Sequence, residues 1–87
     1  MTAYRVVSGA EEDWFDEAAV ADAAVAARLD IAPSDLASVR RRIALDPVVV
    51  RRNGSRWRSR QVWNFRTHGA TVRVFEMLLI DEALYDH

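Results

Sequence analysis

Apolar residues in the first half of the chain recur at spacings of three and four, the period of one face of an α-helix. The stripe consists of Trp14, Ala18, Ala21, Val25 and Leu29. It predicts a helix from Gly9 to about Leu29, and Ser8 with Glu11 three residues later fits a capping box at its start. A short β-prone run over residues 3–7 precedes this helix.

A second helix is expected after a break at residues 30–33, because Pro33 is favourable in the first turn of a helix. Its buried stripe would consist of Leu36, Val39 and Ile43. The Asp-Pro dipeptide at residues 46–47 ends the pattern.

From residue 48 onward the period changes to two, the alternation of a half-buried β-strand. We expect strands over residues 48–52, 55–66 and 70–80. Asn-Gly at residues 53–54 is a strong hairpin signal, and Thr-His-Gly at residues 67–69 makes the second turn. In the middle strand, strict alternation places Arg56, Arg58 and Arg60 on one face and Trp57, Trp63 and Phe65 on the other.

The last strand carries apolar residues at both parities, which is typical of a central strand. The predicted order is β-α-α-β-β-β, within a single domain of residues 1–87, because a chain of this length rarely splits. We therefore expect an α+β fold in which two helices pack on one antiparallel sheet.

The composition excludes several kinds of site. The 87 residues include no cysteine and two histidines, so disulfides and thiolate sites are impossible and a histidine-rich metal centre is not expected. No phosphate-binding glycine loop is present. We expect no metal and no cofactor. No apolar run approaches the roughly 18 residues of a membrane-spanning helix, and no signal peptide is evident, so we expect a cytoplasmic protein without membrane contact.

Charge is strongly segregated along the chain. Residues 1–39 carry two arginines against eight acids, residues 40–66 carry nine arginines against Asp46 alone, and residues 67–87 carry one arginine against four acids. All twelve basic residues are arginine, which binds phosphate through a planar fork and stacks on bases. The middle segment therefore predicts a surface for an anionic partner.

The arginines on and beside the predicted hairpin are the candidate nucleic-acid contacts. They are Arg41, Arg51, Arg52, Arg56, Arg58 and Arg60. Several guanidinium groups on one sheet face with interleaved aromatics can neutralise phosphates and stack on bases. The alternative is a solvated face, or a salt-bridge network between the basic middle and the acidic ends. At the end of the chain, Tyr85 and His87 are candidates for acid–base chemistry.

Taken together, four segments resemble RelE/ParE-type toxins of bacterial toxin–antitoxin pairs. Residues 4–14 look like the first strand of that family running into an acidic helix start, and residues 46–47 resemble its proline-marked helix exit. Residues 57–60, Trp-Arg-Ser-Arg, resemble its basic strand, and residues 84–87, Leu-Tyr-Asp-His, its tail.

The resemblance implies a target and roles for particular residues. It implies an endoribonuclease that cleaves messenger RNA on the ribosome, or an inhibitor of gyrase, together with a cognate antitoxin. Arg58, Arg60 and Arg66 would hold phosphate and stabilise the transition state, and Tyr85 or His87 would take the acid–base roles.

Residues 25–42 also resemble a helix-turn-helix motif, with residues 48–60 as a basic wing. That alternative makes the protein a DNA-binding regulator. Its base contacts would come from Ser34, Asp35, Ser38 and Arg41. A third hypothesis is a non-catalytic protein-binding module, such as a phage-encoded inhibitor, in which the basic sheet meets an acidic protein surface.

Overall fold

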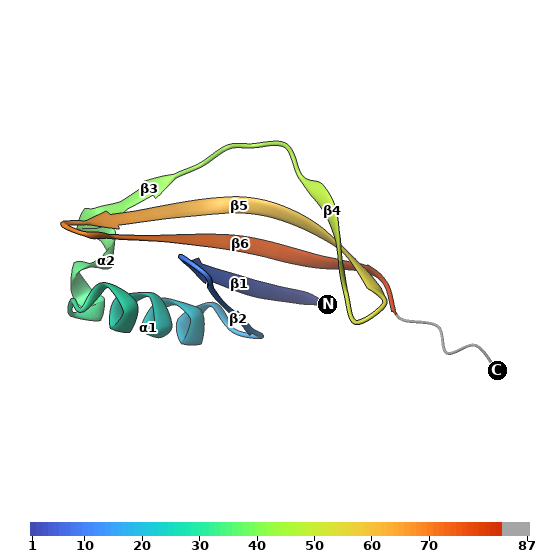
Figure 1. Ribbon diagram of the computed structural model, residues 1–87, viewed down its shortest axis with the longest axis horizontal. Coiled ribbons are helices and arrows are strands. Elements are labelled where there is room, and N and C mark those ends of the chain that lie inside the picture. The colour runs from blue at the N-terminus through green and yellow to red at the C-terminus, as the bar shows by residue number, and fades with distance from the viewer. Residues whose placement is uncertain (83–87) are drawn as a thin grey trace.

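The computed structural model describes residues 1–82 of the 87, and these form a six-stranded sheet with one long helix (Figure 1). The elements are β1 (Thr2–Ser8), β2 (Glu11–Phe15), α1 (Ala18–Leu29), the 3-10 turn η1 (Pro33–Asp35), α2 (Leu36–Val39), β3 (Arg40–Arg42), β4 (Val48–Arg52), β5 (Ser55–Thr67) and β6 (Ala70–Asp81). The strands lie in the order β2-β1-β6-β5-β3, with β4 paired to the other end of β5. Every pairing is antiparallel, so the predicted α+β class is confirmed.

The helix α1 lies against one face of the half of the sheet that ends at the β5–β6 turn (Figure 1). Of the predicted apolar stripe, Ala21, Val25 and Leu29 are buried there, whereas Ala18 is exposed and Trp14 precedes the helix. The core between helix and sheet contains Val6, Ala21, Val25, Ala26, Leu29, Leu36, Phe65, Val72 and Val74. Full burial of a valine or phenylalanine side chain contributes about 1.5–3 kcal/mol, so this layer holds the fold together.

A second core lies on the opposite face, at the other end of the sheet. Ala3, Trp57 and Met77 are buried there, and Trp14 packs over them. The rings of Trp14 in β2 and Trp57 in β5 are 5.2 Å apart in an edge-to-face arrangement. Because β2 and β5 are three strands apart, about 14 Å in a flat sheet, the sheet must curl to bring the two indoles together.

Two β-bulges interrupt the pairing of β5 with β6. Gln61 pairs with Phe75 and Trp63 pairs with Val74, so Val62 is an extra residue in β5. Near the other end of β5, Ile80 is the corresponding extra residue in β6. Beyond Val62 the alternation of β5 is therefore inverted relative to that before it.

This inversion corrects the predicted faces of the middle strand. Arg58 and Arg60 pair with Leu78 and Glu76, on the face that α1 partly covers, which is also the face of Trp63 and Phe65. Trp57 lies on the opposite face. The arginines and the aromatic residues of β5 are therefore not separated onto two faces, because strict alternation takes no account of a bulge.

Two segments predicted as helix are strands. Residues 9–17 do not begin a helix: Gly9 has a φ of 60°, and the chain turns there and returns as β2 against β1. Likewise, the second helix ends at Val39 instead of continuing to residues 46–47, and Arg40–Arg42 form β3 on the outer edge of β5. Pairing with a neighbouring strand outweighs the weak local helix preference in both places.

The left-handed backbone conformation of Asp30 at the end of α1 can be tested by substitution. Asp30 has a φ of 54°, and the helix ends in a Schellman pattern in which the N–H groups of Ile31 and Asp30 donate to the carbonyls of Ala26 and Ala27. Because glycine adopts this conformation without steric cost, Asp30→Gly should raise the free energy of unfolding by about 0.5–1 kcal/mol. Asp30→Ala should lower it. Urea denaturation of the three proteins measures both effects, and a destabilised Asp30→Gly protein would contradict the assignment.

Candidate nucleic-acid interface

The arginines of the middle segment are divided between the two faces of the sheet. We name the face on which α1 lies the helix face and the opposite one the open face. Arg40, Arg42, Arg58 and Arg60 are on the helix face. Arg41 and Arg66 are on the open face, where they are joined by Arg73.

The open face carries a row of polar side chains across three adjacent strands. Arg41 of β3 pairs with Asn64 of β5, which pairs with Arg73 of β6. Arg66 opposite Thr71 stands in the next row toward the β5–β6 turn. We call Arg41, Arg66 and Arg73 the open-face arginines, and all three are exposed.

An aromatic ring and an amide lie next to this row on the side away from the β5–β6 turn. Phe75 pairs with Gln61 on one side and with Arg5 on the other, and all three side chains are half-buried. The guanidinium of Arg5 lies 4.8 Å from the centre of the Phe75 ring, and that of Arg73 lies 5.8 Å from it. This part of the open face, next to the second core, therefore combines cations, amides and the Phe75 ring.

Little negative charge opposes the open-face arginines. Glu12 is the acid nearest in register, and it forms a 3.1 Å ion pair with Arg5. The indole N–H of Trp14 donates a 2.8 Å hydrogen bond to Glu12, and this bond is the main reason why the pKa of Glu12 lies below its ordinary value, with Arg5 adding to the effect. Within residues 1–82 no ion pair joins an acid to any open-face arginine.

Three of the arginines predicted on the hairpin are in other surroundings. Arg56 binds Asp81 through Nε at 2.9 Å and Nη2 at 2.6 Å, and Arg52 lies over the Trp14 ring at 4.2 Å. Arg51, opposite Arg56, is exposed. The contacts of Arg52 and Arg56 link the hairpin to β2 and β6, so we assign these two residues to the fold.

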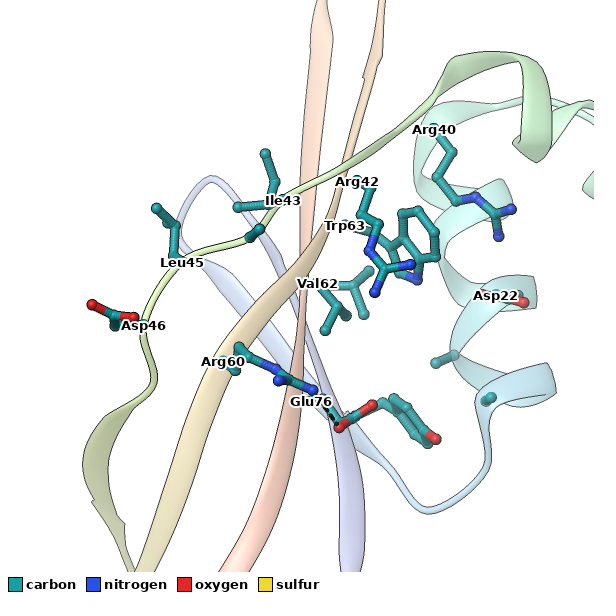
Figure 2. A pocket seen from close by; sticks show the side chains of 15 residues that line it. Asp22, Arg40, Arg42, Ile43, Leu45, Asp46, Arg60, Val62, Trp63 and Glu76 are labelled. Atoms are coloured by element: carbon teal, nitrogen blue, oxygen red, sulfur yellow. Dashed lines mark hydrogen bonds and ion pairs between the residues drawn. The ribbon is translucent and has the colours of Figure 1, made fainter.

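A groove of about 580 Å³ lies on the helix face between α1 and the segment that joins β3 to β4 (Figure 2). Its polar lining residues are Tyr4, Asp22, Arg40, Arg42, Asp46, Arg60, Trp63 and Glu76. Arg40 lies 4.0 Å from the centre of the Trp63 ring, and Arg60 donates a 3.3 Å hydrogen bond to Glu76. Arg58 borders a smaller hollow of about 140 Å³ beside this groove. Both hollows mix cations with acids and apolar walls.

The predicted catalytic set is not assembled in one place. Arg60 is on the helix face and Arg66 on the open face, so the two cannot hold the same phosphate. Tyr85 and His87 lie outside the described residues. In residues 1–82 no three potential metal ligands are grouped.

The arrangement required by the helix-turn-helix hypothesis is not formed. The second helix is the four-residue α2, so Arg41 lies on a strand and not on a recognition helix. The hairpin proposed as the wing is present, with Asn53 at a φ of 52° in its turn.

Sequence reasoning missed Arg73, Phe75, Asn64 and Gln61 on the open face, and Arg40 and Arg42 on the helix face. Alternation did contain a signal for Arg73, because it shares the parity of Phe75. The three consecutive arginines at residues 40–42 gave no such signal while they were interpreted as helix. Once they are on a strand, Arg41 must face opposite to the other two.

Comparison with known proteins gives no match to this chain among protein-family models, curated proteins or solved structures. In the described part of the chain, no helix has the length and apolar character needed to cross a membrane.

The ion pair between Arg56 and Asp81 should be visible in a titration. The hydrogen bonds from Arg56 hold the pKa of Asp81 below its ordinary value, so the contribution of this pair to stability is present above the unfolded-state pKa and is lost as the pH falls through the lower, folded-state pKa. Arg56→Gln should raise the Asp81 pKa toward the ordinary value, as followed by carboxyl-carbon NMR. Arg51→Gln is the control and should change it much less. An Asp81 pKa unchanged in Arg56→Gln would contradict the pairing.

Proposed function

We propose that the protein binds single-stranded RNA through the open face of its sheet. The observation that carries this proposal is that Arg41, Arg66 and Arg73 stand on a sheet face that no helix covers, with no acid paired to them in residues 1–82. Unpaired guanidinium groups attract phosphates, and each contact releases a counterion from the nucleic acid.

The neighbours of these arginines are suited to contact bases. The Phe75 ring can stack on a base if the guanidinium of Arg5 or Arg73, which lies against it, moves onto a phosphate. Asn64 and Gln61 can each donate to and accept from a base edge. Successive rows of the sheet therefore present phosphate contacts and base contacts side by side. An antiparallel sheet face with this mixture is a recurrent way to bind unpaired RNA.

The shape of the surface favours a single strand over duplex DNA. Base reading in a duplex requires an element that enters the major groove, usually a helix or a two-stranded ribbon. The open-face arginines are instead spread over β3, β5 and β6, across the breadth of a sheet that cannot enter a groove. A strand with splayed bases can lie across such a surface.

We further propose that the target is messenger RNA, as the resemblance to RelE-type toxins implies. In support of RNA over gyrase, the amides and the aromatic ring of the open face match nucleotide chemistry. This assignment makes the open face the binding surface of a toxin-like protein, and it predicts that expression of the protein arrests bacterial growth.

Removal of two open-face arginines should weaken RNA binding. Arg41→Ala combined with Arg66→Ala deletes two phosphate contacts, so we expect a loss of about tenfold in affinity per arginine for a short unpaired RNA. The slope of log K against log salt should become shallower by about 1.4, because each contact to a single strand contributes about 0.7. Filter binding or fluorescence anisotropy at several salt concentrations measures both quantities.

The matched control is Arg51→Ala combined with Arg58→Ala. This variant loses the same charge from exposed positions outside the open face and should retain most of the affinity. Equal losses in the two variants would indicate attraction to overall charge and refute a localised site. Growth arrest on expression should follow the same order, with relief in Arg41→Ala/Arg66→Ala and persistence in the control.

Replacement of the aromatic ring should separate stacking from charge. Phe75→Leu keeps an apolar side chain at the edge of the second core but removes the flat ring, which is worth about 1–3 kcal/mol per stacked base. We expect a loss of at least about fivefold in RNA affinity with an unchanged salt dependence. Phe75→Tyr is the control and should bind as the wild type does. A loss in Phe75→Leu with a changed salt slope would argue against stacking.

A further inference from the structure

The groove on the helix face has the chemistry of a separate ligand site. We infer that it binds a nucleoside phosphate, either as a free nucleotide or as the terminal nucleotide of an RNA strand. The groove lies on the face of the sheet opposite to the open-face arginines, so this inference does not require RNA binding there.

The phosphate-binding part of the groove is formed by Arg40 and Arg42. They are two residues apart on β3, so both side chains leave the strand on the same face, and Figure 2 shows both of them near the Trp63 ring. In residues 1–82 neither of them forms an ion pair. Two adjacent guanidinium forks match the tetrahedral oxygens of a phosphate group.

The ring of a nucleobase would contact Trp63. This half-buried indole lies in the floor of the groove, in register with Arg42 and with Arg40 over it at 4.0 Å. When the base stacks on Trp63, it would replace Arg40 on the ring. The guanidinium of Arg40 would then be free to contact the phosphate. Inorganic phosphate could contact the two arginines but has no ring to stack on the neighbouring tryptophan, whereas a nucleotide can do both.

Carboxylates supply the third part of the site. Asp22 on α1 and Glu76 on β6 line the groove (Figure 2). Tyr4 on β1 is a further lining residue. One oxygen of Glu76 accepts from Arg60, and the other is available to accept from ribose hydroxyls or an exocyclic amine. These acids would repel an anion that lacked donor groups, whereas a nucleotide carries donors at one end and charge at the other.

The size of the groove agrees with this ligand. About 580 Å³ lies within the range of sites that enclose small molecules, which is roughly 300–1,000 Å³. Ala18 and Ala21 on α1 and Val62 and Val74 on the sheet give it apolar walls between the charged groups. The two parts of a nucleoside phosphate match these two parts of the groove. Its base would contact the apolar walls, and its phosphate would lie among the arginines.

The experiment follows the three indole N–H signals in NMR while adenosine or guanosine 5′-monophosphate is added. Trp63 should shift, whereas Trp14 and Trp57 should not, because they pack in the second core on the opposite face. Trp63→Phe assigns the signal. Adenosine and inorganic phosphate, which each carry one part of the ligand, should bind at least tenfold more weakly than the nucleotides. No shift of Trp63 at millimolar nucleotide would overturn the inference.

Two substitutions locate the phosphate contact. Arg42→Ala should weaken nucleotide binding about tenfold or more, since a charge-assisted contact is lost. Arg51→Ala removes the same charge from β4, away from the groove, and should have no effect. Equal affinities in Arg42→Ala and the wild type would refute the site, provided that the indole signals show both proteins to be folded.

The two sources of the nucleotide can be distinguished in the Arg41→Ala/Arg66→Ala protein. If this variant still binds free nucleotide at Trp63, the groove is a site in its own right even where RNA binding is lost. If a short RNA shifts Trp63 in the wild type and free nucleotide competes with it, the groove holds the terminal nucleotide of the strand. Shifts confined to residues around Phe75, with either ligand, would refute the groove and leave the open face as the only site.

Discussion

The extra residue Val62 in β5 determines which arginines can act together. Without it, Arg60 and Arg66 would share a face, and all the arginines of β5 would lie on one side of the sheet. With it, Arg58 and Arg60 before the bulge are on the helix face, and Arg66 after it is on the open face. One residue thus converts a single basic surface into two surfaces of different character, because side chains alternate strictly on either side of a bulge.

The bulge is held in place by its surroundings. The carbonyl oxygen of Val62, which is not used in the ladder with β6, accepts a 3.0 Å hydrogen bond from the N–H of Ile43 at the end of β3. The Val62 side chain packs against the core beneath α1. The pairing of β3 with β5, which places the three arginines at residues 40–42, thus extends up to the bulge.

Much of this fold could be predicted from the sequence, and the failures have physical causes. The Asn-Gly hairpin and the buried positions Ala21, Val25 and Leu29 of α1 are local features, and both predictions were confirmed. The strand β2 and the strand β3 were missed because their stability comes from partners far away in the sequence, β1 and the outer edge of β5. The bulge leaves no trace in the pattern of residues 55–66, so the faces of Arg58 and Arg60 could not be placed by alternation alone.

The near-neutral charge of the chain does not argue against a phosphate-binding surface, because four acids of residues 1–82 are paired with arginines outside the set Arg41, Arg66 and Arg73. Asp13 pairs with Arg28 on α1, Glu12 with Arg5, Asp81 with Arg56 and Glu76 with Arg60. Each pair joins neighbouring elements of the fold, and each leaves the open-face arginines untouched. Since exposed charges are screened beyond about 8–10 Å, the local balance around Arg41, Arg66 and Arg73 decides what this face attracts, and that balance is positive.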